Sequence, residues 1–92
     1  MILQYNISVL GKVQGVWFRK YTQQKAKDLK LLGIVKNQLD SSVYIEAVGD
    51  EKTLNSFINW LKTEGSPLSQ VSEVTYNTTK QIKNYINFDI IK

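Results

Sequence analysis

Apolar and polar residues alternate along the first ten positions, which is the pattern of a strand with one buried face. The apolar positions are Leu3, Tyr5, Ile7 and Val9, and the polar ones between them are Gln4, Asn6 and Ser8. They predict a strand from Ile2 to Gly11. After a short loop, the residues at helical spacing are Phe18, Thr22, Ala26, Leu29 and Leu32. They predict a helix from Phe18 to Leu32, with Gly33 as the C′ glycine that ends it.

The middle of the chain predicts two strands joined by a tight turn. Ile34 to Leu39 forms the first strand, Asp40-Ser41-Ser42 supplies turn residues, and Val43 to Gly49 alternates as the second strand. Asp50 is suited to cap a following helix, because its carboxylate can accept a hydrogen bond from an unpaired backbone N–H. The apolar stripe of that helix consists of Leu54, Phe57, Ile58 and Leu61.

The last third of the chain predicts two more strands. Gly65 and Pro67 are expected to stop the second helix. Val71 to Thr79 predicts a fourth strand, and Asn77 to Asn84 is the polar stretch expected to form a mobile loop. A short final strand is predicted from the alternation of Ile86, Phe88 and Ile90.

The predicted order is βαββαβ with a short extra C-terminal strand, the split-βαβ or ferredoxin-like pattern of the α+β class. We expect a single domain over residues 1–92, with two helices on one face of an antiparallel sheet. In this topology the first two strands run in the same direction, and the third lies between them. The loop after the first strand and the far end of the second therefore meet at one edge, roughly 9.6 Å apart. The fold does not specify function, since enzymes, RNA-binding proteins and regulatory modules share it.

Composition excludes several kinds of chemistry. The chain has no cysteine and no histidine, which removes thiolate chemistry and the commonest general base and metal ligand. Its carboxylates are scattered along the sequence, so we expect no metal site. The apolar helix stripes and aromatic rings are interpreted as core, so no cofactor is expected either. No apolar run approaches the roughly 20 residues of a membrane span, and no leader is evident. A cytoplasmic protein without a membrane partner is therefore expected.

The formal net charge is +4, and the lysines are dispersed rather than clustered. This charge is typical of a solvated surface, and it would also steer a small anion toward a binding site. An RNA-binding sheet of the same topology would carry a denser basic stripe or an aromatic run on its central strand. The predicted third strand offers only Tyr44, so nucleic acid is not expected as a partner.

The stretch between the first strand and the first helix carries the candidate chemistry. Gly11 and Gly15 flank a short loop, and Arg19 stands at the start of the helix. Such a loop directs unpaired backbone N–H groups and the positive end of the helix dipole toward one point, which suits an anion. Gly15 permits close approach of a ligand, and Arg19 can add a planar fork. We interpret the stretch as a phosphate-binding loop formed by the backbone of Gln14, Gly15, Val16, Trp17, Phe18 and Arg19.

Two side chains of this loop allow alternative interpretations. Arg19 is the only arginine among the 12 basic residues, which fits either a bidentate anion contact or a stray arginine on a helix surface; the glycines and the strand–loop–helix context favour the first. Trp17 can form an apolar wall for a bound group or pack on the helix. Covalent catalysis is not expected, because Val13 stands where a Cys-x5-Arg phosphatase loop has its cysteine.

The sequence resembles the acylphosphatases over nearly its whole length. The resemblance is carried first by Gly11-x-Val13-Gln14-Gly15-Val16-x-Phe18-Arg19, and then by Ala26, Leu29, Leu31, Gly33, Val35-x-Asn37 and Asp40-x-Ser42-Val43. It continues more loosely through Gly49, Phe57, Trp60-Leu61 and Phe88-x-Ile90. Three residues depart from the usual pattern: Lys30 and Ser41 stand where glycine is frequent, and Ile34 where tryptophan is.

The resemblance implies a small, cofactor-free hydrolase that cleaves the carboxyl–phosphate bond of acyl phosphates. It implies that Arg19 binds the phosphate and that Asn37 positions the attacking water. Residue chemistry agrees, because a carboxylate leaving group needs little help from a general acid such as histidine. Without the resemblance, Asn37 would be interpreted as an ordinary strand-end or turn asparagine. Inorganic phosphate is the expected product and competitive ligand, and a monomer is expected.

One competing hypothesis is a non-catalytic module of the same fold. Such a module would bind an anion without turnover, or would dock on a larger protein as the acylphosphatase-like domains of hydrogenase maturation factors do. The presence of both Arg19 and Asn37 favours the enzyme.

Overall fold

A computed structural model describes residues 1–91 as a five-stranded sheet with two helices. The elements in chain order are β1 (Ile2–Lys12), α1 (Phe18–Asp28), β2 (Leu32–Asn37), β3 (Val43–Asp50), α2 (Glu51–Thr63), β4 (Gln70–Thr79) and β5 (Phe88–Ile91). The strand order in the sheet is β4-β1-β3-β2-β5. β1 pairs antiparallel with both β3 and β4, β2 pairs antiparallel with β3, and β5 pairs in parallel with β2. The predicted ferredoxin-like α+β fold is confirmed.

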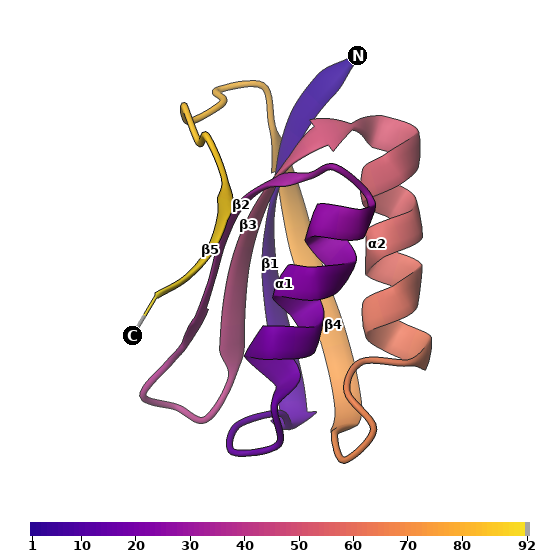
Figure 1. The fold of residues 1–92 in the computed structure, drawn as a ribbon, viewed down its shortest axis with the longest axis vertical. Helices are drawn as coiled ribbons and strands as arrows, with labels where there is room; N and C mark the ends of the chain where they lie inside the picture. Colours follow the sequence, from indigo (N-terminus) through magenta and orange to yellow (C-terminus); the bar gives the residue numbers. More distant parts are fainter. Residues whose placement is uncertain (92) are drawn as a thin grey trace.

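Both helices cover the same face of the sheet (Figure 1). The buried face of β1 is the predicted one, because Ile7 and Val9 are fully buried and Leu3 and Tyr5 nearly so. The helices add one buried face each: Phe18, Thr22 and Ala26 from α1, and Leu54, Phe57, Ile58 and Leu61 from α2. Burying one of the Leu, Ile or Phe side chains among them contributes about 1.5–3 kcal/mol to folding. The core therefore lies between the helices and the sheet.

The second helix begins and ends as the sequence predicts. The Asp50 carboxylate accepts a hydrogen bond from the backbone N–H of Lys52 at 3.1 Å, which satisfies one of the free donors of the first turn. At the other end, the N–H of Gly65 donates to the carbonyl oxygen of Trp60 at 3.2 Å. The cap and the terminating glycine are both confirmed.

The first helix ends earlier than predicted. It stops at Asp28, and the N–H of Lys30 donates to Lys27 while that of Leu31 donates to Ala26, at 3.0 and 2.9 Å. This is a Schellman motif, which needs a left-handed residue at C′. Lys30 takes that role, with φ of 60°. The prediction of a helix to Leu32 ending at Gly33 is wrong, because the chain reverses on a lysine that carries no terminating signal.

Gly33 instead lies within β2, which covers Leu32–Asn37 rather than Ile34 to Leu39. Its φ is 151°, and a Cβ at this position would lie 1.8 Å from the carbonyl oxygen of Glu46 on β3. The glycine therefore permits close approach of β2 to β3 instead of ending a helix. Leu39, predicted at the end of the strand, is fully exposed in the turn that follows.

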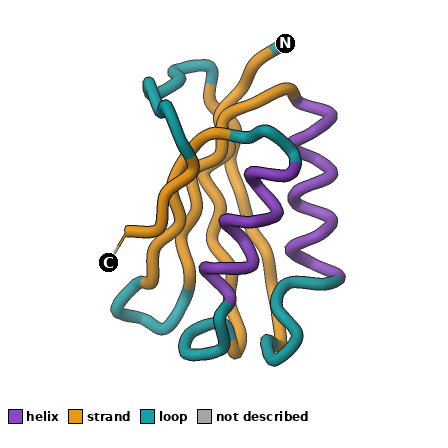
Figure 2. The backbone as a smooth tube through the Cα atoms, viewed as in Figure 1, coloured by secondary structure: helices purple, strands orange, loops and turns teal. Residues whose placement is uncertain are grey.

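The connection from β4 to β5 also differs from the prediction. Asn77 belongs to β4, which continues to Thr79, so the loop comprises only residues 80–87 (Figure 2). Ile86 lies in this connection, and the last strand begins at Phe88. The connection crosses the sheet face opposite the helices, where the N–H of Lys83 donates to Oε1 of Gln4 at 2.9 Å. Hydrogen bonds to the sheet thus anchor this segment.

Glu46 is the centre of that second face. Its carboxylate is only 8% exposed and accepts hydrogen bonds from the hydroxyls of Tyr44 and Tyr85, and its Oε1 lies 3.0 Å from Nζ of Lys83. Burial by itself would raise the pKa of Glu46, but the hydrogen bonds from Tyr85, Tyr44 and Lys83 outweigh burial and hold it below its ordinary value. Burial and the neighbouring carboxylate raise the pKa of Tyr44 to about 12. An ionised carboxylate therefore joins the connection to the sheet.

Candidate active site

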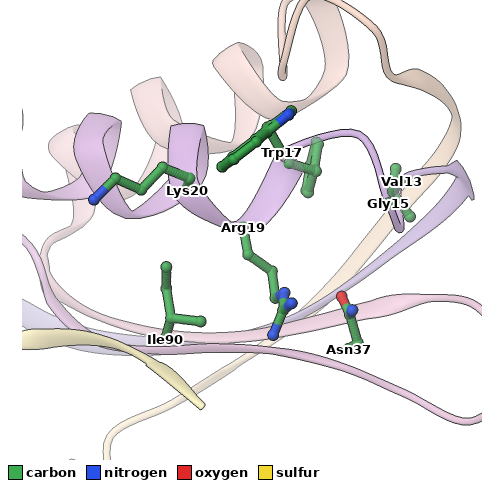
Figure 3. A pocket seen from close by; sticks show the side chains of 8 residues that line it. Val13, Gly15, Trp17, Arg19, Lys20, Asn37 and Ile90 are labelled. Atoms are coloured by element: carbon green, nitrogen blue, oxygen red, sulfur yellow. The ribbon is translucent and has the colours of Figure 1, made fainter. Parts of the chain in front are cut away.

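A cavity of about 460 Å³ opens where the β1–α1 loop, the end of β2 and β5 meet. It is lined by Val13, Gly15, Trp17, Phe18, Arg19, Lys20, Asn37 and Ile90 (Figure 3). The β1–α1 loop and the β2–β3 turn lie at the same end of the sheet (Figure 1). This placement follows from the strand order, in which β1 and β2 run in the same direction on either side of β3. The expected meeting of loop and strand end is confirmed.

The backbone of the loop takes a left-handed turn at two positions. Gly15 has φ of 73°, and a Cβ there would meet nothing within 4 Å. Trp17 has φ of 64° and is the N-cap residue of α1, but its side chain makes no capping hydrogen bond, and no acidic residue stands in the first turn. The N–H groups and the positive dipole end of α1 thus remain available to an external anion.

Arg19 and Lys20 make the cavity positively charged. In Figure 3 the Arg19 side chain extends from α1 toward β2, where Asn37 lies, whereas Lys20 extends along the helix. Nη1 of Arg19 donates to the carbonyl oxygen of Ile91 at 3.4 Å. Among residues 1–91 this contact occupies one of the five guanidinium N–H donors and leaves the others to a ligand. None of the lining residues is acidic.

Asn37 presents a buried acceptor to the cavity. It is the last residue of β2, and its Oδ1 is buried without a hydrogen-bond donor among residues 1–91. The turn that follows is instead held by Asp40, which accepts from the N–H and the hydroxyl of Ser42 at 3.0 and 2.5 Å. These two bonds lower the pKa of Asp40. Asp40 therefore makes the hydrogen bonds that an ordinary turn asparagine would make, and Asn37 lines the same cavity as Arg19 with its Oδ1 lacking a donor among residues 1–91.

Four of the six predicted loop residues line the cavity, and two do not. Gln14 turns its amide to the β2–β3 turn, where Nε2 donates to the carbonyl oxygens of Gln38 and Ser42, both at 2.8 Å. Val16 is buried in the core. Trp17 is 72% exposed and lines the cavity, so it is not packed away against the helix.

Three lining residues were not predicted as site residues: Val13, Lys20 and Ile90. Val13 was considered only as the position where a nucleophilic cysteine is absent. Lys20 follows Arg19 directly, and its charge was a signal that could have been used. Ile90 had no signal of this kind, because it comes from β5 and reaches the site only through the pairing of β5 with β2.

The part of the chain that the structure describes offers no group of three or more acidic, histidine or cysteine side chains that could hold a metal ion. Within the same residues, no helix is long and apolar enough to cross a membrane. A ferredoxin-like sheet with a positively charged cavity at a helix N-terminus defines a small α+β protein whose cavity is suited to an anion.

Comparison with known proteins defines this class further. The acylphosphatase family model matches residues 5–90. The chain is 41% identical over 90 residues to the acylphosphatase of Bacillus subtilis (strain 168), covering 98% of each sequence. It is 36% identical over 93 residues to acylphosphatase-1 of Homo sapiens, covering 99% of this chain and 94% of that one. The crystal structure of the Bacillus subtilis acylphosphatase matches with a TM-score of 0.94 over 98% of this chain and 99% of that chain.

The chain therefore belongs to the acylphosphatase family, whose activity is the hydrolysis of acyl phosphates. The chain is therefore an acylphosphatase enzyme rather than a non-catalytic module of the same fold. A lower identity of 33% relates it to full-length HypF in a phosphate- and nucleotide-bound form, with a TM-score of 0.88 over all of this chain and 12% of that chain.

Proposed function

We propose that the cavity binds the phosphoryl group of an acyl phosphate and directs a water molecule onto it without a metal ion. The backbone from Gln14 to Arg19 and the Arg19 guanidinium bind the phosphoryl oxygens, and Asn37 positions the water. The observation that supports this proposal best is the buried, unfilled Oδ1 of Asn37 in the same cavity as Arg19. A buried acceptor of this kind requires a donor, and a water molecule can supply one.

The proposed reaction is an in-line displacement at phosphorus. Oxygen of the water forms a bond to phosphorus while the bond between phosphorus and the acyl oxygen breaks, giving a carboxylate and inorganic phosphate. The proton of the water passes to a phosphoryl oxygen of the substrate, because an amide is a poor base. Catalysis then depends on positioning and on stabilising the charge of the phosphoryl oxygens.

Each part of the site has one role in this scheme. The uncapped start of α1 and the left-handed turns at Gly15 and Trp17 direct backbone N–H groups toward the phosphoryl oxygens. Arg19 adds a charged fork from the first turn of the helix. Mutagenesis of comparable electrostatic donors gives roughly 2.7–4 kcal/mol for one such contact.

The remaining properties of the protein are also proposals. Residues 1–92 form a single acylphosphatase domain that acts as a monomer in the cytoplasm, with inorganic phosphate as product and competitive ligand and without nucleic acid as a partner. The dispersed lysines and the lone aromatic residue of the central strand β3, Tyr44, support the last point. Sedimentation of the purified chain, with and without phosphate, tests the monomer.

The deciding experiment is the hydrolysis of acetyl phosphate in the presence of a chelator. Wild-type protein, Arg19→Ala and the surface control Lys52→Ala are compared under the same conditions. We expect turnover that survives the chelator, falls by about a hundredfold or more in Arg19→Ala and is unchanged in Lys52→Ala. Turnover lost on chelation, or retained in Arg19→Ala, would contradict the proposed mechanism.

A further inference from the structure

A serine far from the loop in sequence holds the loop backbone. Ser66 lies between α2 and β4 and is only 1% exposed. Its hydroxyl donates to the carbonyl oxygen of Val16 at 2.8 Å, across 50 positions of the chain. Figure 1 shows the α2–β4 loop and the β1–α1 loop at the same end of the sheet. The contact is therefore a tertiary one, made in the interior.

Ser66 is itself fixed in place by its own turn. Its N–H donates to Oγ of Ser69 at 3.0 Å, and that hydroxyl donates back to the carbonyl oxygen of Ser66 at 2.7 Å. The preceding Gly65 packs so closely on the Phe18 ring that an added Cβ would lie 3.0 Å from it. The serine hydroxyl thus has a defined position relative to the start of α1.

We propose that Ser66 is a positioning residue that orients the peptide between Val16 and Trp17 for phosphate binding. In a trans peptide the carbonyl oxygen and the next N–H point in opposite directions. Because Ser66 holds the Val16 oxygen in the interior, the N–H of Trp17 points the other way, toward the cavity that Trp17 lines. With the peptide in this orientation, the backbone of Trp17 is left-handed, with φ of 64°.

The orientation of the Val16–Trp17 peptide decides which end of its dipole faces the anion. With the peptide as it stands, a donor faces the phosphoryl group. Rotation of the same peptide would present a carbonyl oxygen to an anionic oxygen, which repels it. The Ser66 hydroxyl selects the first orientation, and this inference rests on the proposed phosphate-binding role of the loop.

The test compares Ser66→Ala and Ser66→Cys with two controls. Cysteine keeps a weak donor at nearly the same volume. Ser56→Ala removes a serine hydroxyl that donates to a backbone carbonyl on the outer face of α2, at 3.3 Å. Ile58→Val loosens the core under α2 at a residue that lies within the helix and outside the turn of Ser66. Each variant is measured for phosphate dissociation constant, acetyl phosphate kinetics and thermal midpoint, and the Trp17 amide resonance is followed during phosphate titration.

We expect phosphate affinity to fall about tenfold in Ser66→Ala and by an intermediate factor in Ser66→Cys. The phosphate-induced shift of the Trp17 amide should shrink in the same order, while Ser56→Ala and Ile58→Val bind as the wild type does. A Ser66→Ala protein with wild-type phosphate affinity, or an Ile58→Val protein of equal stability with an equal loss of affinity, would overturn the inference.

These readouts separate the inference from the proposed function. If the wild type bound phosphate through the Trp17 amide but did not hydrolyse acetyl phosphate, the catalytic proposal would fail and the role of Ser66 would stand. If hydrolysis were intact but the Trp17 amide did not respond to phosphate in any variant, the role of Ser66 would be rejected.

Discussion

The side-chain amide of Gln14 lies 2.8 Å from the carbonyl oxygen of Gln38 and donates to it. Gln14 belongs to the candidate phosphate-binding loop, and Gln38 directly follows Asn37. One side chain therefore sets the spacing between the part of the site that binds the anion and the part proposed to hold the water. A second bond from the same nitrogen to the carbonyl oxygen of Ser42 fixes the other side of the turn.

Replacing Gln14 should therefore weaken the site without removing a ligand-binding side chain. Gln14→Leu removes the amide that bonds the loop to the Gln38 and Ser42 carbonyl oxygens, each of which then keeps only a backbone N–H donor from within the turn. We expect kcat/KM for acetyl phosphate to fall about tenfold, because the loop and the turn lose their direct link. Gln24→Leu is the matched control, because the Gln24 amide donates to Asp28 on the exposed surface of α1. Equal kinetics for the two variants would show that the tie between loop and turn has no role.

Arg19 should not be replaceable by lysine. A lysine retains the charge but not the planar fork that binds two phosphoryl oxygens together. We expect Arg19→Lys to lose most of the phosphate affinity and turnover, and Arg19→Ala to lose about 2.7–4 kcal/mol of transition-state stabilisation, on the scale of comparable contacts. Phosphate titration and acetyl phosphate kinetics measure both effects. Full activity in Arg19→Lys would mean that charge alone suffices.

Asn37 should affect turnover more than binding. Asn37→Ala removes the buried acceptor proposed to hold the water, so we expect kcat to fall by about two orders of magnitude while the phosphate dissociation constant changes little. Inorganic phosphate binding, measured by calorimetry, is compared with single-turnover kinetics. Matched losses of affinity and rate would instead place Asn37 on the phosphate.

Two departures from the family pattern should cost stability. Lys30 and Ser41 both have left-handed backbones, with φ of 60° and 78°, at positions where the resemblance leads one to expect glycine. The left-handed conformation costs an L-residue roughly 1–2 kcal/mol, partly offset by the greater freedom that glycine has when unfolded. We expect Lys30→Gly and Ser41→Gly each to raise the free energy of unfolding by about 0.5–1 kcal/mol.

Urea denaturation tests these substitutions against a glycine placed elsewhere. Lys27→Gly introduces the same residue inside α1 and should lower the free energy of unfolding by about 0.5–1 kcal/mol. If all three variants were destabilised alike, backbone strain at Lys30 and Ser41 would not be the relevant quantity.

Glu46 should make stability depend on acid. Hydrogen bonds from Tyr85, Tyr44 and Lys83 outweigh burial and hold its pKa below the ordinary value of 4.5, so the unfolded chain binds this proton more readily than the folded one. The stabilisation is then complete above about pH 4.5 and is lost as the pH falls through the lowered pKa. We expect the urea midpoint of the wild type to fall on acidification more steeply than that of Glu46→Gln. Parallel pH profiles for the two proteins would show that another group is responsible.

Local patterns in the sequence were sufficient where a structural element depends on its own residues. The alternation of β1, the apolar stripe of α2 and the Asp50 cap are set by side chains a few positions apart, and the structure confirms them. The glycine-containing loop before Arg19 was recognised for the same reason. The predicted end of α1 was wrong because Lys30 adopts a left-handed backbone, which a lysine does not predict.

The sequence by itself determined the fold class, the family and the pair of residues, Arg19 and Asn37, that the cavity brings together. Only the tertiary structure decided how that cavity is completed and braced: Ile90 arrives with β5, Gln14 reaches the β2–β3 turn, and Ser66 holds the Val16 carbonyl. These contacts join residues 24 to 50 positions apart or depend on strand pairing. Their partners are chosen by which segments pack side by side, and no local period in the sequence records that choice.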